Sequence, residues 1–119
     1  MIYLILLITV ALAIERENGI IVFVSLITPL REFRQSARTI IGDDYFQEVF
    51  VKASFNTCQE RDVKGLYAKA SDGLVPSFTG KGSDFEEPVD QQFIIDSEKE
   101  IEDISSEKLF QFVLDLISL

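Results

Sequence analysis

The distribution of apolar residues divides the chain into segments that alternate between strand-like and helix-like patterns. Ile20–Leu26 (IIVFVSL) is rich in β-branched and aromatic residues, which is typical of a strand buried on both faces. Thr28 and Pro29 follow, and apolar residues then recur at helical spacing until Gly42. A hydroxyl before a proline is a common helix start, and glycine is a common helix end. The pattern therefore predicts a buried strand, a tight turn capped by Thr28 and an amphipathic helix.

The same alternation continues towards the carboxyl terminus. Phe46–Lys52 and Phe93–Ile95 have the length and composition of two further strands. Strands that alternate with helices predict an α/β fold with a mostly parallel sheet, in which ligands bind at the carboxyl ends of the strands. The turn at Thr28 lies at such an end, so it is a candidate for a binding site.

Capping signals predict three shorter helices. They are expected over residues 54–61, where Ser54 is the cap, over residues 65–70, and after Ser105-Ser106, with Leu109, Val113, Leu116 and Ile117 on the apolar face. Residues 77–88 are rich in glycine, serine and acidic residues, which predicts a long loop of the functional or mobile kind. Residues 96–103 are interpreted as an acidic surface stretch.

The first fourteen residues are apolar except for Thr9. A helix that crosses a bilayer needs about 20 such residues, and a signal peptide normally has a basic start and a small-residue cleavage site. A buried strand or helix is therefore the favoured interpretation. Secretion and a membrane anchor are the alternatives.

Composition narrows the function classes further. The 119 residues fit one ordinary domain, and 47% hydrophobic with 26% charged residues predicts a buried core. Eleven basic residues against twenty acidic ones give a net charge of −9, which argues against a nucleic-acid partner. There is no histidine, and Cys58 is the single cysteine. Zinc fingers, disulfide scaffolds and hydrolases with a catalytic histidine are therefore excluded, and no metal ligands are predicted.

Three arginines form the clearest candidate for an anion site. Arg31, Arg34 and Arg38 stand at positions i, i+3 and i+7 of the predicted helix, so they share one face behind the amides of the helix start. The alternative is that they pair with surface carboxylates, and spacing alone leaves both interpretations open.

A second basic group precedes the helix at residues 65–70. Arg61 and Lys64 precede the flexible Gly65, and Lys69 follows one turn beyond Lys64. Such a group suits a nucleotide polyphosphate, because lysine and arginine both bind phosphate and arginine also stacks on bases. Phe78 could stack on a planar base at the start of the long loop. The alternatives are that the charges are ordinary surface residues and that Phe78 anchors the loop to the core.

Together these segments resemble the adenylyl-sulfate kinase family, P-loop enzymes that use ATP and magnesium to phosphorylate the 3′-hydroxyl of adenylyl sulfate. The resemblance runs from about Asn18 to the carboxyl terminus. Residues 25–29 (SLITP) with the spaced arginines are similar to the family's SFISP segment, and Phe46–Val51 is similar to its next strand. The most specific match is residues 58–70 (CQERDVKGLYAKA), followed in order by Gly73, residues 78–80, Glu86 and Pro88.

The resemblance implies roles for individual residues. Ile27 would pack on the adenine of adenylyl sulfate, and Thr28 takes the place of a serine that the family is described as using as a phosphoserine intermediate. Lys64 and Phe78 match positions that contact this substrate, with Phe78 as the stacking ring. The arginine face, with Arg31 and Arg34, would bind the same substrate. Cys58 and Arg61 match positions beside the adenine of ATP.

The lid, at about residues 62–88, departs from the family pattern. Ser71 replaces an arginine, Pro76 replaces a lysine, and Lys81-Gly82 stand where Ile-Asp is usual. No G-x-x-x-x-G-K-[ST] motif occurs in the sequence, and the family's DGD segment is absent. We therefore expect a partial P-loop-kinase-like parallel sheet of three family-like strands plus helices, without the first half of the fold. The expected division is an apolar segment over 1–17 and a partial kinase domain over 18–119.

The expected function is ATP-dependent formation of 3′-phosphoadenylyl sulfate in the cytoplasm. Adenylyl sulfate and ATP would be the substrates, with Mg²⁺ as a family cofactor whose ligands are not in this sequence. No nucleic acid or membrane partner is expected, and the chain would form a homodimer or associate with a complete kinase chain. One alternative is a catalytically inactive, truncated paralogue that binds nucleotide or pairs with a complete kinase subunit. Another is a small acidic protein tethered to a membrane by residues 1–14.

Overall fold

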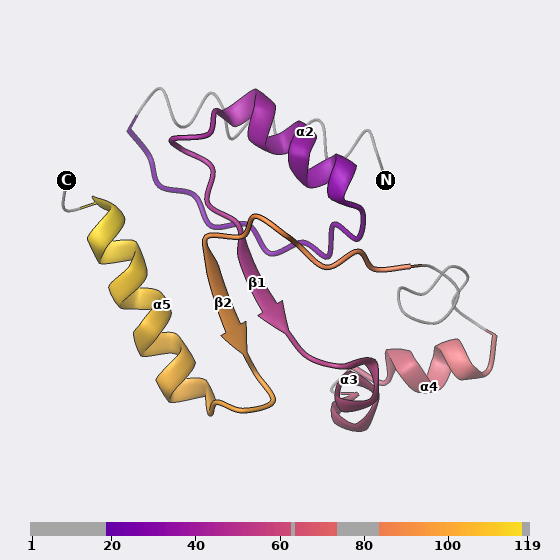
Figure 1. Ribbon diagram of the computed structural model, residues 1–119. Helices are drawn as coiled ribbons and strands as arrows, with labels where there is room; N and C mark the ends of the chain where they lie inside the picture. The colour runs from indigo at the N-terminus through magenta and orange to yellow at the C-terminus, as the bar shows by residue number, and fades with distance from the viewer. Residues whose placement is uncertain (1–18, 63, 74–83, 118–119) are drawn as a thin grey trace. The chain divides into compact units, whose positions relative to one another are not determined.

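The computed structural model describes residues 19–62, 64–73 and 84–117. They fall into two compact units, of which one contains a single helix and the segment 84–88 and the other contains two strands and three helices. In chain order the elements are α2 (Arg31–Ile41), β1 (Val49–Lys52), α3 (Phe55–Arg61), α4 (Leu66–Ser71), β2 (Phe93–Asp96) and α5 (Glu102–Ile117) (Figure 1).

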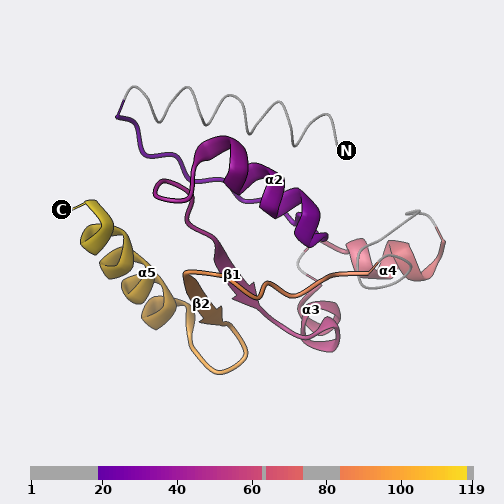
Figure 2. The same ribbon diagram turned by 45° about the horizontal axis from the view of Figure 1, so that its top comes forward.

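A two-stranded parallel sheet organises the larger unit. Val49 lies opposite Phe93 and Lys52 opposite Asp96, so β1 and β2 pair along their whole length. Parallel strands need a crossover connection, and here it contains α3 and α4. Helix α5 runs beside β2 in both views (Figures 1 and 2). The ring of Phe112 stacks on that of Phe93 with 4.8 Å between centroids. The predicted α/β class with parallel strands is confirmed.

The two short helices start where local signals predict. The Ser54 hydroxyl accepts a hydrogen bond from the Thr57 amide at 3.2 Å, which confirms it as the cap of α3. Helix α4 follows Gly65, whose φ of 63° lies in the left-handed region that favours glycine. The Asp62 carboxylate accepts the amides of Tyr67 at 3.0 Å and Ala68 at 3.2 Å. The turn between the two helices is therefore tied to the first turn of α4.

The last helix begins earlier than predicted. We expected Ser105-Ser106 to cap it, but α5 already begins at Glu102. The helix therefore begins within residues 96–103, which we interpreted as an acidic surface stretch. Glu102 and Asp103 occupy its first turn, where negative charge is favourable next to the helix dipole. Ser105 is buried inside the helix at 7% exposure, and its hydroxyl donates to the Glu100 carboxylate at 3.3 Å. Acidic residues rather than serines therefore start this helix.

In the smaller unit, α2 ends as predicted and starts differently. Gly42 ends the helix with a φ of 100°, a conformation in which glycine is strongly favoured. Thr28 does not cap the helix start, because the helix begins at Arg31 and the residue before it, Leu30, has no side-chain capping bond. The Glu86 carboxylate accepts the Arg31 amide instead, at 2.7 Å. A residue 55 positions away in the chain thus supplies the cap.

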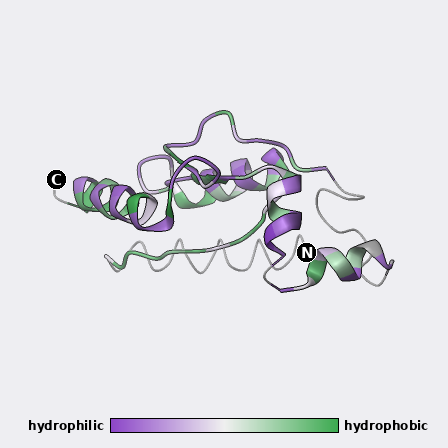
Figure 3. Ribbon diagram, turned by 90° about the horizontal axis from the view of Figure 1, so that it is seen from below, coloured by the Kyte–Doolittle hydropathy of each residue, from purple (hydrophilic) through white to green (hydrophobic). Residues whose placement is uncertain are grey.

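The buried strand predicted over Ile20–Leu26 is wrong. These residues follow an irregular path, and Phe23 is 71% exposed (green run in Figure 3). A strand needs a hydrogen-bonding neighbour, and no backbone hydrogen bond between described residues involves this run. The described part of the chain thus has two strands rather than three, and the strand predicted over Phe46–Lys52 begins only at Val49. An apolar run indicates a segment that favours burial, but it does not supply a pairing strand.

Some predicted elements fall outside the described residues. These are the apolar segment 1–14 and most of the long loop, with Phe78. Within the described ranges, no helix has both the length and the apolar character needed to cross a bilayer.

Candidate functional site

Two of the three arginines of the candidate anion site bind backbone carbonyl groups in the smaller unit. Arg34 donates through Nη1 to the carbonyl of Thr28 and through Nη2 to the carbonyl of Glu86, both at 2.6 Å. Arg31 donates through Nε to the carbonyl of Glu87 at 2.8 Å. The Arg34 guanidinium also lies 5.8 Å from the ring centre of Phe85. The arginine face thus joins the turn before α2 to the segment 84–88.

The third arginine has a different role. Arg38 lies 3.9 Å from the Asp43 carboxylate, and its guanidinium is 5.0 Å from the ring centre of Phe46. It therefore pairs with a surface carboxylate, as one of our two interpretations held, whereas Arg31 and Arg34 bind carbonyl groups, which neither interpretation included. Their part in substrate binding stays a prediction.

The turn before α2 has a strained residue next to an exposed apolar one. Thr28 has a φ of 39°, which is rare for a β-branched side chain and stores strain. Its carbonyl is held by Arg34. Ile27 is 68% exposed, so its side chain is accessible to a planar group. The role of the Thr28 hydroxyl stays a prediction.

Replacing Glu86 by alanine should destabilise α2. The change removes the carboxylate that accepts the Arg31 amide and leaves one more unsatisfied N–H group at the helix start. Loss of such a cap typically costs about 1 kcal/mol of the free energy of unfolding. The Glu87→Ala variant is a matched control, because Glu87 contributes its backbone carbonyl to Arg31. Urea unfolding followed by circular dichroism should show a lower midpoint for Glu86→Ala alone, and equal midpoints for the two variants would contradict the capping role.

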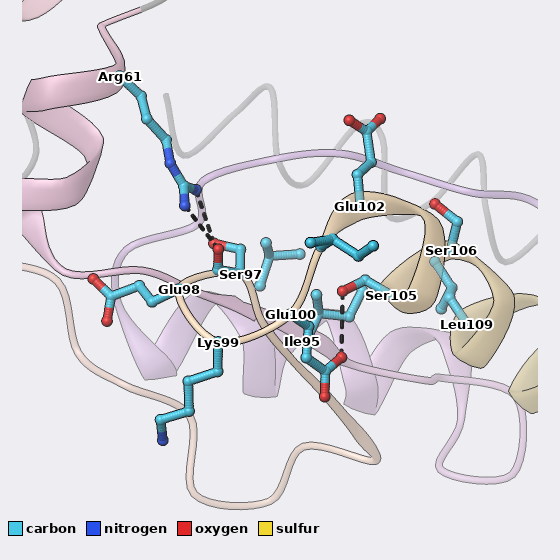
Figure 4. Close-up of a pocket in the computed structure, with 12 residues that line it drawn as sticks. Arg61, Ile95, Ser97, Glu98, Lys99, Glu100, Glu102, Ser105, Ser106 and Leu109 are labelled. Atoms are coloured by element: carbon cyan, nitrogen blue, oxygen red, sulfur yellow. Dashed lines mark hydrogen bonds between the residues drawn. The ribbon is translucent and has the colours of Figure 1, made fainter.

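An open depression of about 730 Å³ lies at the carboxyl ends of the two strands in the larger unit (Figure 4). Val51 and Ile95 form part of its floor, and Arg61, the turn over residues 97–99 and the start of α5 form its sides. The carboxyl edge of a parallel sheet is where α/β proteins bind ligands. This depression is therefore a second candidate binding site, within the larger unit.

Arg61 is fixed at this depression by the turn that follows β2. Its Nη2 donates to the Ser97 carbonyl at 2.7 Å and its Nη1 to the Ser97 hydroxyl at 3.2 Å (Figure 4). The Ser97 hydroxyl in turn donates to the carbonyl of Lys52, at the end of β1, at 3.0 Å. The ends of β1, β2 and α3 are thus joined through one serine.

The next residue holds the other end of α3. One carboxylate oxygen of Glu98 accepts the Ser54 amide at 2.9 Å, the Ser54 hydroxyl at 2.6 Å and the Thr57 hydroxyl. These hydrogen bonds, those from the Ser54 and Thr57 hydroxyls first, lower the pKa of Glu98 to about 2. The carboxylate therefore stays ionised at neutral pH.

Cys58 and Lys64 do not line the depression. Cys58 is half-buried, and its side chain is hydrogen-bonded to Tyr67, whose pKa is raised by burial first and by this bond second. The Tyr67 ring is also 5.4 Å from that of Phe55, so Cys58 lies at the contact between α3 and α4. Lys64 is exposed in the turn between these helices. Of the residues predicted to bind the nucleotide at this place, Arg61, Cys58 and Lys64, only Arg61 lines the depression.

Sequence reasoning missed the turn over residues 97–99. We interpreted residues 96–103 as acidic surface, although they directly follow a predicted strand. The rule that ligands bind at the carboxyl ends of parallel strands could have singled them out. Within residues 19–62, 64–73 and 84–117, no cluster of three histidine, cysteine or acidic residues could hold a metal ion.

Comparison with known proteins identifies the family. The family model described as "Adenylylsulphate kinase" matches residues 5–96. The chain is 40% identical over 97 residues to the "Probable adenylyl-sulfate kinase" of Halalkalibacterium halodurans, which covers 82% of this chain and 48% of that protein. It is also 40% identical over 99 residues to the "Adenylyl-sulfate kinase" of Bacillus licheniformis, with coverage of 83% and 50%.

A solved structure of the same family is similar to this chain in fold. The APS kinase CysC of Mycobacterium tuberculosis, determined in complex with AMPPNP and APS, superposes with a TM-score of 0.64 at 34% identity. The match covers 79% of this chain and 53% of that one. The chain belongs to the adenylyl-sulfate kinase family and has part of its P-loop kinase fold. It spans about half the length of the curated relatives it matches.

Proposed function

We propose that this chain takes part in the ATP-dependent phosphorylation of the 3′-hydroxyl of adenylyl sulfate, which gives 3′-phosphoadenylyl sulfate. The family match over residues 5–96 carries the proposal. Relatives at 40% identity are named adenylyl-sulfate kinases, and a third relative was solved with AMPPNP and APS. These names support ATP and adenylyl sulfate as the substrates.

The proposed adenylyl-sulfate side includes the turn before α2. Ile27 offers an exposed apolar side chain to the adenine ring, and the carbonyl bond from Arg34 holds the turn in place. The bond from Arg31 to Glu87 uses one of its five N–H donors, so this guanidinium can still serve an anionic group. Thr28, Lys64 and Phe78 complete the proposed set by their match to the family motif.

The proposed nucleotide side is the depression at Arg61. Its volume of about 730 Å³ lies within the usual range for small-molecule sites, roughly 300–1,000 Å³. Two hydrogen bonds to Ser97 orient the planar guanidinium, and such a plane stacks well on an adenine ring. Cys58 lies on the same helix and is included because it matches a family position beside the adenine of ATP, although it does not line the depression.

The described residues of this chain do not fit a magnesium site. The described ranges have no three-carboxylate cluster, and the sequence has no G-x-x-x-x-G-K-[ST] motif whose hydroxyl could bind the ion. The proposed part of this chain is therefore to bind and orient the two nucleotides.

A chimera tests the proposed function. The 99 matched residues of the Bacillus licheniformis kinase would be replaced by those of this chain. We expect the chimera to form 3′-phosphoadenylyl sulfate, because the relative supplies the half that this chain does not match. A chimera that folds, as judged by circular dichroism, and shows no turnover would contradict the proposal.

A second candidate function is a non-catalytic partner of a complete kinase chain or of a second copy. The observation that favours it is the exposed apolar run Ile20–Leu26, which has the composition of a buried strand. Exposed runs of this kind favour association.

We expect the chain to form oligomers that depend on this run. Light scattering should show a mass that rises with concentration, and Phe23→Lys should lower it by introducing a charge where the side chain is 71% exposed. The Phe110→Lys variant, on an exposed part of α5, is the control. A monodisperse monomer at every concentration would contradict the expectation.

A further inference from the structure

Helix α3 is held at both ends by two adjacent residues of one turn. At its start, the Glu98 carboxylate accepts hydrogen bonds from Ser54 and from Thr57. At its end, the Arg61 guanidinium donates to Ser97. The helix has seven residues and no buried side chain, so burial does little to fix its position. These polar bonds, together with the contacts of Phe55 and Cys58 with Tyr67, therefore constrain where Arg61 lies.

We propose that Glu98 is a positioning residue that holds α3 so that Arg61 lines the depression at the ends of β1 and β2, and that it thereby sets the affinity of this site for the adenine nucleotide. The inference rests on the proposed function, in which Arg61 stacks on the adenine of ATP. Glu98 also lines the depression, but in this proposal it acts through Arg61 rather than by contact with the nucleotide.

The chemistry of the cluster suits this role. Glu98 places three acceptor bonds on a single oxygen, and hydrogen bonds to an ionised acceptor are the stronger kind. The Ser54 hydroxyl both donates to Glu98 and accepts the Thr57 amide, so the cap of α3 and its anchor share one atom. The low pKa of Glu98 keeps the acceptor ionised throughout the neutral range. Loss of the carboxylate would release the helix start and with it the direction of the Arg61 side chain.

The test measures ATP and adenylyl sulfate binding to the full chain by NMR titration, with ATP taken into the millimolar range. We expect Glu98→Ala to raise the Kd for ATP about ten-fold and to leave the Kd for adenylyl sulfate within two-fold. Glu98→Gln keeps an acceptor oxygen at the same place, so it should restore most of the ATP affinity. Glu107→Ala removes an exposed carboxylate of α5 and is the matched control. If Glu98→Ala fails to fold, Glu98→Asp replaces it, since the shorter side chain keeps the charge and withdraws the acceptor.

A double-mutant cycle with Arg61→Ala separates positioning from general stability. Residues that act through one another give non-additive effects, whereas independent ones add. We expect the Glu98→Ala, Arg61→Ala double variant to bind ATP no more weakly than Arg61→Ala alone. Additive losses, or a Glu98→Ala variant that binds ATP like the parent, would overturn the inference and leave the proposed function standing. A parent chain that binds adenylyl sulfate but not ATP would overturn both the inference and the proposed nucleotide side.

Discussion

The 119-residue chain by itself is expected to form 3′-phosphoadenylyl sulfate far more slowly than about 1 per second, the lower end of ordinary kinase rates. Phosphoryl transfer is catalysed largely by positioning and by stabilising charge on the phosphates. The usual means are backbone amides and a lysine of a G-x-x-x-x-G-K-[ST] loop with a bound magnesium ion, and this sequence contains no such loop. The residues that match the family motif are those proposed above to contact the two nucleotides.

A coupled assay with ATP, adenylyl sulfate and Mg²⁺ checks this expectation. The Bacillus licheniformis relative serves as the positive control, and the chimera described above should be active under the same conditions. Turnover of the chain alone at about 1 per second or faster would contradict the prediction.

Phe78→Ala is expected to weaken the binding of adenylyl sulfate ten-fold or more. Phe78 matches the position of the family's stacking ring, and base stacking on an aromatic side chain is worth roughly 1–3 kcal/mol. About 1.4 kcal/mol corresponds to ten-fold in Kd. The prediction rests on the sequence match, because Phe78 lies outside the described residues.

Calorimetric titration with adenylyl sulfate measures this effect. Phe110→Ala is a matched control, since it removes a ring of the same size from an exposed position on α5. The control should bind like the parent. If Phe78→Ala also binds like the parent, the ring does not stack on the substrate.

Sequence patterns succeeded where the signal is local. Gly42 ends α2 and Ser54 caps α3 because each acts on backbone groups within a few residues of itself. The pairing of β1 with β2 also follows from the pattern, because a strand, a helical crossover and a second strand form a parallel pair. These features place the depression at the ends of the two strands.

The pattern failed where the partner is distant or absent from the described residues. Ile20–Leu26 has the composition of a strand, but no described segment pairs with it. The α2 cap comes from Glu86, which no rule about neighbouring residues could identify. The spacing of Arg31 and Arg34 placed them on one face, yet it could not show that they bind the carbonyls of Thr28, Glu86 and Glu87.

Local patterns singled out most residues of the candidate site, and the resemblance to the family supplied their roles. Helical spacing and local composition singled out the arginine face and the pair Arg61 and Lys64. The resemblance to the family added Ile27 and Cys58. Neither route found Glu98, because its two partner residues, Ser54 and Thr57, lie more than 40 positions away and the stretch 96–103 around it is mostly acidic. Its anchoring of α3 became visible only from the hydrogen bonds.

Calorimetric titration of the unmodified chain with adenylyl sulfate and, separately, with ATP tests the central claim most directly. The claim is that these residues form the adenylyl-sulfate side of a kinase site, with the turn at Ile27 and Thr28, the arginine face, Lys64 and Phe78 retained and no loop for the phosphates of ATP. We expect a lower Kd for adenylyl sulfate than for ATP. Tighter binding of ATP, or no binding of adenylyl sulfate by a folded chain, would contradict it.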